Sequence, residues 1–131
     1  MLSPRHFSLV AAVAASTLLL YPSLHAQQVV ATAIDATGKP HHLEGREFPG
    51  LQHFVMPVYS HGDRLTRRQG TGLFRLYIDL KTGFVTQVAV VKSTGWWSVD
   101  TSAVNALRKW RWKPGTWKEV NVPVQFAMGS H

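Results

Sequence analysis

Residues 93–115, with the sequence STGWWSVDTSAVNALRKWRWKPG, contain four of the five tryptophans of this chain. An apolar stripe with helical spacing runs through this stretch at Val99, Ala103, Ala106, Leu107 and Trp110. That spacing predicts an amphipathic helix over residues 98–110, with the stripe facing a core. Ser98 suits the N-cap of this helix, and Asp100 in its first turn complements the helix dipole. We expect the helix to end before the proline and glycine at positions 114 and 115.

A β-hairpin is predicted directly before this helix, over residues 71–92. The segment TGLFRLYIDL alternates apolar and polar side chains, which is typical of a strand with one buried face. The turn KTG ends in Gly83, where a positive φ is expected, and a valine-rich strand returns from it. Val85 does not share the parity of Val88 and Val90, which predicts a β-bulge at the two residues between Val85 and Val88.

The segment KEVNVPVQFAM near the end of the chain predicts a last strand over residues 119–127. Pro123 has no N–H to donate to a sheet ladder, so this strand is predicted to lie at a sheet edge. If Pro123 faces outward, the free backbone groups belong to Asn121, to the Pro123 carbonyl and to Gln125. The predicted fold class is α+β: a small antiparallel sheet, made of hairpin 71–92 and this edge strand, packed on one main helix.

The first residues have the layout of a secretory signal peptide. Arg5 precedes an apolar run of fourteen residues, and a small residue, Ala26, stands where signal peptidase cuts. The run is shorter than the roughly 20 residues that span a bilayer, so cleavage is favoured over a retained inner-membrane anchor. The expected organisation is a signal peptide at residues 1–26, an irregular lead-in at 27–56 with room for one hairpin, and a domain at 57–127. This layout predicts export to the periplasm.

Composition narrows the classes of function. The chain has no cysteine, and residues 64–131 contain eleven Lys or Arg against three Asp or Glu. This balance is compatible with an anionic partner or with a solvated basic face. The histidines show no metal-ligand spacing, and no Ser, His and acid cluster stands out. We therefore expect no catalytic residues, no metal, no cofactor and no enzymatic activity.

The order strand, turn, strand, helix, strand resembles the C-terminal domain of TonB, the periplasmic energy transducer of Gram-negative bacteria. The resemblance covers residues 57–126 and is carried by GLFRLYID (72–79), TGFVTQVAVVKSTG (82–95), AVNALRKWRWKPG (103–115) and VNVPVQF (120–126). It implies that Trp110 and Trp112 pack in the core, with the basic residues between them pointing outward. The Pro-rich spacer of TonB proteins has no counterpart in residues 27–56, so coupling to an inner-membrane motor stays open.

In this family a short extended segment of an outer-membrane transporter adds as a strand beside the last strand of the domain. The resemblance therefore implies a periplasmic protein-binding module for an outer-membrane receptor or other envelope protein, with energy-coupled transport as one setting. The predicted partner-binding residues are Val120, Asn121, Pro123, Gln125, Trp96 and Trp97. Two alternatives stay open: a domain that forms homodimers through the same edge, and a binder of an anionic envelope polymer. Nucleic acid is not expected as a partner.

Overall fold

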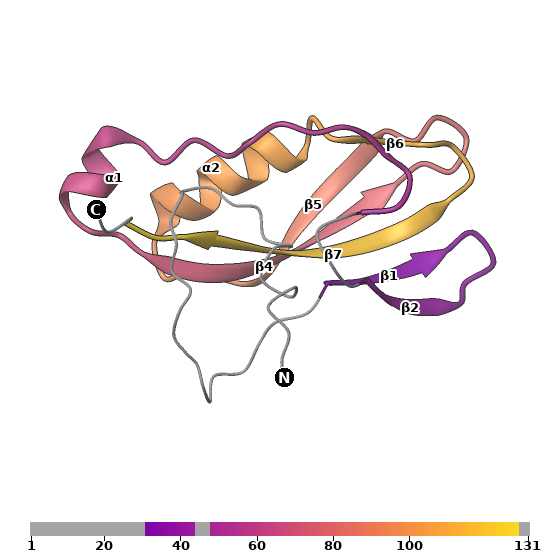
Figure 1. Cartoon of the computed structure of the whole chain (residues 1–131), viewed down its shortest axis with the longest axis horizontal. Coiled ribbons are helices and arrows are strands. Elements are labelled where there is room, and N and C mark those ends of the chain that lie inside the picture. Colours follow the sequence, from indigo (N-terminus) through magenta and orange to yellow (C-terminus); the bar gives the residue numbers. More distant parts are fainter. Residues whose placement is uncertain (1–30, 44–47, 129–131) are drawn as a thin grey trace.

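A computed structural model of the chain describes residues 31–43 and 48–128 (Figure 1). The predicted signal peptide, residues 1–26, lies outside the described residues. The elements are β1 (Ala31–Asp35), β2 (Pro40–Leu43), β3 (Leu51–His53), α1 (His61–Leu65), β4 (Gly70–Ile78), β5 (Val85–Lys92), α2 (Trp97–Leu107), β6 (Arg111–Trp112) and β7 (Trp117–Phe126). Neither helix in these two ranges is long and apolar enough to cross a membrane.

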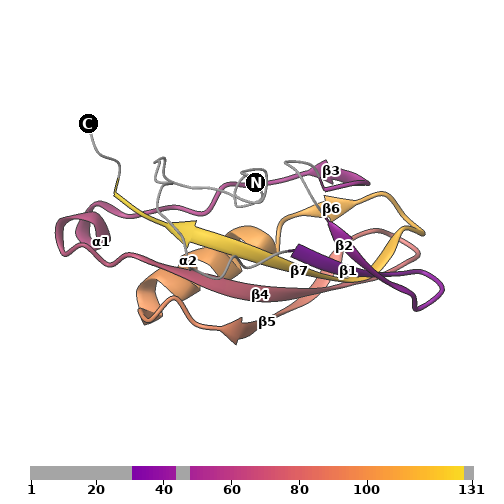
Figure 2. The same ribbon diagram turned by 60° about the horizontal axis from the view of Figure 1, so that its bottom comes forward.

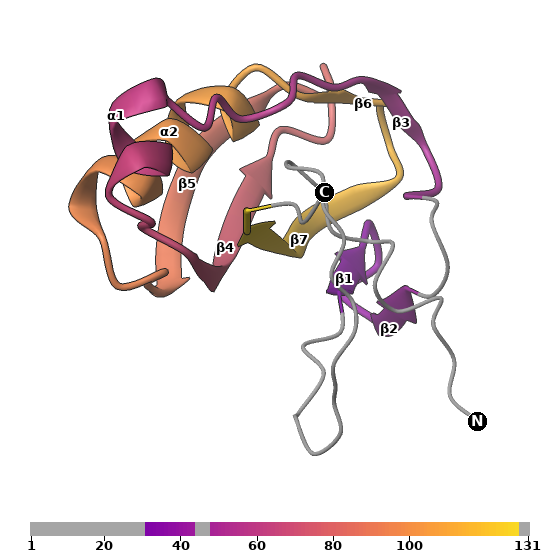
Figure 3. The ribbon, with the colours of Figure 1, turned by 60° about the vertical axis from the view of Figure 1, so that its left-hand side comes forward.

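The strands form a five-stranded antiparallel sheet in the order β2-β1-β7-β4-β5, and β3 and β6 pair separately as a two-stranded sheet. Helices α1 and α2 lie on the same side of the large sheet, as the view in Figure 3 shows. The predicted α+β fold class is therefore confirmed. The sheet is larger than the sequence predicted, because residues before position 57 contribute two of its strands.

The predicted hairpin is confirmed as β4 and β5, including its irregularity. Tyr77 lies opposite Gln87, but the next residue of β4, Ile78, lies opposite Val85. Thr86 is therefore the extra residue of a bulge, at the position that the parity of the valines indicated. A second bulge interrupts the pairing at the other end of β5, next to Lys92.

The turn between β4 and β5 is held against β6. Gly83 has the expected positive φ, +80°, and its carbonyl accepts a hydrogen bond from the Trp112 amide at 2.8 Å. A Cβ atom at this position would collide with the Trp112 carbonyl. Glycine is therefore required here both for the backbone angle and for the close approach of β6.

The last strand is not an edge strand, which corrects the prediction for residues 119–127. β7 pairs with β4 on one side, from Gly70 opposite Phe126 to Tyr77 opposite Glu119, and with β1 on the other. The lead-in that the sequence left irregular contains the β1–β2 hairpin, and this hairpin covers the side of β7 that was expected to be open (Figure 2).

Pro123 can lie within the interior strand β7 because the described pairs between β1 and β7 do not include it. The β1–β7 register described here begins with Thr32 opposite Asn121, two residues away from Pro123. On the other side, Pro123 lies opposite Leu73 of β4. A proline costs a ladder bond only on the side toward which its N–H would point, and no described strand is paired with Pro123 on the β1 side.

Helix α2 begins one residue before its predicted start and ends three residues before its predicted end, and its N-cap is Trp96 rather than Ser98. The Ser98 hydroxyl instead donates a hydrogen bond to Asp63 Oδ1 at 2.7 Å, which ties α2 to α1. Asp100 does lie in the first turn, where its Oδ1 accepts from the amide and hydroxyl of Thr94 at 2.8 and 2.6 Å. The predicted favourable position of this carboxylate is confirmed.

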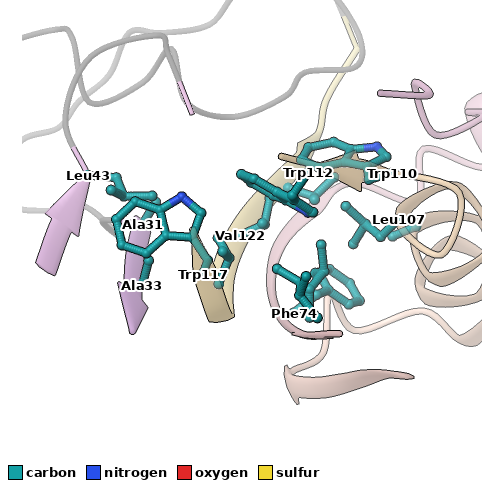
Figure 4. Packing of buried hydrophobic residues seen from close by; sticks show 14 of the residues in the cluster. Ala31, Ala33, Leu43, Phe74, Leu107, Trp110, Trp112, Trp117 and Val122 are labelled. Carbon is teal, nitrogen blue, oxygen red and sulfur yellow. The ribbon is translucent and has the colours of Figure 1, made fainter. Parts of the chain in front are cut away.

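The tryptophans of the opening stretch divide as the resemblance implied. Trp110 and Trp112 are 3% and 1% exposed and lie beside Leu107 in the core, and a third tryptophan, Trp117, packs near the alanines of β1 (Figure 4). The basic residues interleaved with the first two are all exposed: Arg108, Lys109, Arg111 and Lys113. Most of the tryptophans therefore serve packing, since each buried ring removes a large apolar area from water.

Candidate functional site

Two of the predicted binding residues, Val120 and Asn121, lie in the part of β7 that is paired on both sides. Val120 is fully buried opposite Ala33. The side-chain amide of Asn121 donates to Thr32 Oγ1 at 2.8 Å, and its oxygen accepts from Arg75 Nε at 3.0 Å. The expected open edge at these two residues is therefore wrong, because β1 already uses it.

Pro123 and Gln125 lie further along β7, where the described part of β1 does not reach. Pro123 is buried and Gln125 is half-buried. At Pro123 only the carbonyl could bind a strand, since proline has no N–H. Nothing in the structure tests whether these two residues contact a partner, so their role stays a prediction.

The outer strands of the large sheet are β2 and β5. β2 has four residues and begins with a proline, whereas β5 has eight residues and contains none. A partner strand needs a continuous row of backbone donors and acceptors, so β5 is the better template for strand addition.

The direction of the backbone groups in β4 follows from two hydrogen bonds near the turn. The Asp79 amide donates to the Phe84 carbonyl at 2.9 Å, and the Tyr77 carbonyl accepts from Thr86 Oγ1 at 3.2 Å. Both odd-numbered residues therefore direct their backbone groups toward β5. Because this direction alternates along a strand, the even-numbered residues of β4 bond to β7 instead.

This alternation identifies the free backbone groups of β5. Val88 and Val90 lie opposite Leu76 and Phe74, which bond to β7, so the two valines turn their N–H and C=O groups away from β4. Ala89 between them bonds inward. The two bulges limit this regular stretch to four pairs, and within it the valines offer two donors and two acceptors to a strand from outside.

Apolar side chains accompany this open edge. Val90 is 46% exposed and Val91, the extra residue of the second bulge, is 45% exposed. β5 contains no acidic residue and ends in Lys92. An added strand would therefore gain both backbone hydrogen bonds and apolar contacts.

The two remaining predicted binding residues differ from each other. Trp96 donates from its indole to the Gln69 carbonyl at 3.2 Å, and the Arg68 guanidinium lies 5.5 Å from its ring centroid. Trp97 is 80% exposed. It precedes Asp100 by three residues, and Asp100 accepts hydrogen bonds from Ser93 and Thr94 directly after β5, so Trp97 lies on the side of α2 next to the end of β5. Trp97 is thus the larger exposed apolar group beside the open edge.

Two carboxylates have a lowered pKa, and both stabilise the fold. The hydroxyl of Ser98, together with Ser60 and Arg68, holds the pKa of buried Asp63 below its ordinary value, against the opposing effect of burial. Hydrogen bonds within the β1–β2 turn, from Thr37 and others, do the same for Asp35. Across residues 31–43 and 48–128, no three His, Asp or Glu side chains come together as metal ligands.

Residues 55–128 match the sequence model of a family described as Gram-negative bacterial TonB protein C-terminal. No curated protein and no solved structure matches the chain. The family match covers α1, β4, β5, α2, β6 and β7. It begins after β3, so the β1–β2 hairpin that covers β7 lies outside the matched residues.

Proposed function

The chain belongs to the Gram-negative bacterial TonB protein C-terminal family, a family of protein-interaction domains of the cell envelope, and we propose that it binds an extended segment of another envelope protein by strand addition along β5. The observation that carries the proposal is the outward direction of the backbone groups of Val88 and Val90 on a long outer strand. The partner class proposed is an outer-membrane receptor or another envelope protein, met in the periplasm. Energy-coupled transport is the setting that the family suggests.

The proposed edge supports modest affinity by itself. Four added backbone hydrogen bonds at about 0.5–1.5 kcal/mol each contribute on the order of 2–6 kcal/mol before ordering costs. Micromolar binding needs roughly 8 kcal/mol, so side-chain anchors must supply the rest. Trp97, 80% exposed on the adjacent flank of α2, is the anchor we propose.

A second copy of this chain is the competing occupant of the same edge. Two β5 strands could pair antiparallel about a twofold axis, since each presents the same outward groups. The observation that favours this alternative is the apolar exposure of Val90 and Val91 on an unpaired outer strand. Sedimentation velocity over a range of concentrations distinguishes the two occupants.

A pair of variants at one position tests strand addition. Val90→Pro removes an outward N–H without removing a bond of the β4–β5 ladder, whereas Val90→Thr keeps the N–H and the branched shape. A photoreactive residue in place of exposed Gln87, which leaves Trp97 intact, captures the partner in intact cells, and each Val90 variant is then added to that protein. Capture should be lost with Val90→Pro and kept with Val90→Thr; equal capture by both would contradict pairing at β5.

A further inference from the structure

A cluster of exposed cations lies at the end of the sheet far from α1. Its members come from three regions of the chain: Lys39, Lys81, Arg111, Lys113 and Lys118. Figures 1 and 2 both show the β1–β2 turn, the β4–β5 turn and the loop between β6 and β7 gathered at this end. We call these five residues the basic end.

Backbone hydrogen bonds fix the three turns of the basic end against one another. The Ala36 amide of the first turn donates to the Thr116 carbonyl at 3.1 Å. The Gly115 amide donates to the Leu80 carbonyl at 2.8 Å. The position of the cluster is thus set by the fold, although its members lie far apart in the sequence.

No member of the basic end forms an ion pair with a described residue. The nearby carboxylates have other partners within the described ranges. Asp35 accepts hydrogen bonds within its own turn, Asp79 accepts from the Lys81 amide at 2.9 Å, and Glu119 lies 3.8 Å from Arg75 Nε. These carboxylates keep their negative charge, but the five cations outnumber them, so the field at this end of the molecule is positive on balance.

An exposed aromatic ring lies within the cluster. Phe84 is 49% exposed, and the Arg111 guanidinium lies 4.4 Å from its ring centroid. An apolar ring beside cations is the combination that interfacial membrane-binding surfaces use, with the charges at the headgroups and the ring at the acyl boundary.

We propose that the basic end docks on the anionic headgroups of a phospholipid bilayer. Its cations are spread over three turns and the strands beside them, an arrangement that suits a broad charged surface better than a single bound anion. The open hollow of about 510 Å³ at this end is lined by Lys81 and Lys118 but also by Asp79 and Glu119, so it does not form a dedicated anion pocket. An acidic peptide would need a groove or a free strand, and the open part of β5 begins only beyond Phe84.

Membrane docking is independent of strand addition, because it uses different residues. Helix α1 and the start of α2, which is Trp97, lie at the opposite end of the domain from the β4–β5 turn (Figure 1). A domain held at a bilayer by its basic end would leave Trp97 and the outward groups of Val88 and Val90 accessible to a protein partner.

Vesicle flotation of residues 27–131, the chain that the predicted cleavage after Ala26 leaves, tests the proposal with two variants that remove equal charge. Vesicles contain either phosphatidylglycerol mixed with phosphatidylcholine or phosphatidylcholine alone. The test pair is Lys81→Gln with Lys113→Gln, and the matched control at the other end is Arg64→Gln with Arg67→Gln; all four residues are exposed. Each cation near an anionic surface strengthens partitioning about five-fold, so the test pair should weaken binding about 25-fold and the control less than about three-fold.

We expect the wild-type chain to float with the anionic vesicles, less so at high salt, and not with phosphatidylcholine alone. Phe84→Ser should weaken vesicle binding relative to wild type, and the difference should be largest at high salt, where charge attraction is screened and the apolar contact contributes most. Val90→Pro should leave vesicle binding unchanged, which separates this proposal from strand addition. Equal losses in the two double variants, no binding to anionic vesicles, or competition by soluble polyglutamate at the same charge concentration would overturn the proposal.

Discussion

The three strands β7, β4 and β5 have one covered flank and one open flank. On one flank, β7 receives a strand from the same chain, and small side chains such as Ala33 pack there against the core. On the other flank, β5 ends the sheet with exposed valines and outward backbone groups. An open sheet edge therefore cannot be assigned from the sequence of one strand alone, because another segment of the same chain can pair with it.

The open flank also carries features that limit uncontrolled pairing. β5 has a bulge on each side of its four regular pairs, and Lys92 ends the strand. Bulges and lysines on outer strands are devices that discourage edge-to-edge aggregation. A short, bounded template of this kind favours a brief peptide contact over an extended fibre.

The largest effect is expected from breaking the covered flank. Ala33 is 2% exposed opposite Val120, so Ala33→Asp would place an unpaired carboxylate in the core. We expect a loss of about 3–5 kcal/mol in the free energy of unfolding, measured by urea denaturation. His42→Asp, on the exposed side of β2, is the control and should cost less than about 1 kcal/mol. Equal costs would show that β1 is not integral to the core.

A pair of prolines tests the backbone direction on the open flank. Ala89→Pro removes a bond of the β4–β5 ladder and should cost about 3 kcal/mol. Val90→Pro removes only an outward N–H and should cost about 1 kcal/mol or less, apart from the lost valine contacts. Urea denaturation measures the free energy of unfolding of both variants. A larger loss for Val90→Pro than for Ala89→Pro would show that the backbone groups of Val90 point toward β4 and are not free.

The pH dependence of the covered flank follows from Asp35. Its pKa lies below the ordinary value, chiefly because of the Thr37 hydroxyl, so the carboxylate stabilises the folded state above the unfolded pKa near 4. That contribution is lost as the pH falls through the lowered folded pKa. The difference in unfolding free energy between wild type and Asp35→Asn should shrink as the pH falls below about 4. A difference that grows as the pH falls below about 4 would contradict this assignment.

The smallest effect on stability is expected at Trp97. Because its ring is 80% exposed, Trp97→Ala should change the free energy of unfolding by less than about 0.5 kcal/mol while weakening partner capture. Trp96→Ala is the matched control, since it removes an indole hydrogen bond to Gln69 and should cost about 1 kcal/mol. If Trp97→Ala lowers the free energy of unfolding but leaves partner capture unchanged, the ring of Trp97 serves packing and not binding.

Patterns with a strong period were predictable, and short strands were not. The β4–β5 hairpin, its bulge at Thr86 and the burial of Trp112 all followed from residue spacing or from the family resemblance. β1 and β2 are short, and β1 packs through two alanines, which carry little signal of burial. The indole N–H of Trp112 is buried and finds no partner among the described residues, and we have no physical account of it.

The error about the candidate site came from Pro123. Its missing N–H was interpreted as evidence for an edge strand, and that argument considered β7 without the segment that precedes the domain. Proline is equally compatible with an interior strand where its missing N–H faces no ladder partner, and on the β4 side Pro123 lies opposite Leu73, whose backbone groups point toward β5. Which edge is free therefore depends on pairing between residues nearly ninety positions apart, and local sequence patterns carry little information about such pairing.

Site-specific crosslinking at two glutamines is the most direct test of whether a partner binds beside β5. Gln87 lies on β5 and Gln125 on β7, so the same photoreactive residue at each position compares the open strand β5 with the strand that the sequence predicted to bind. If the partner binds along β5, we expect adducts to an envelope protein from position 87 and few from position 125 in intact cells. Adducts confined to position 125 would contradict it, because they would place the partner beside the end of β7 and not beside β5.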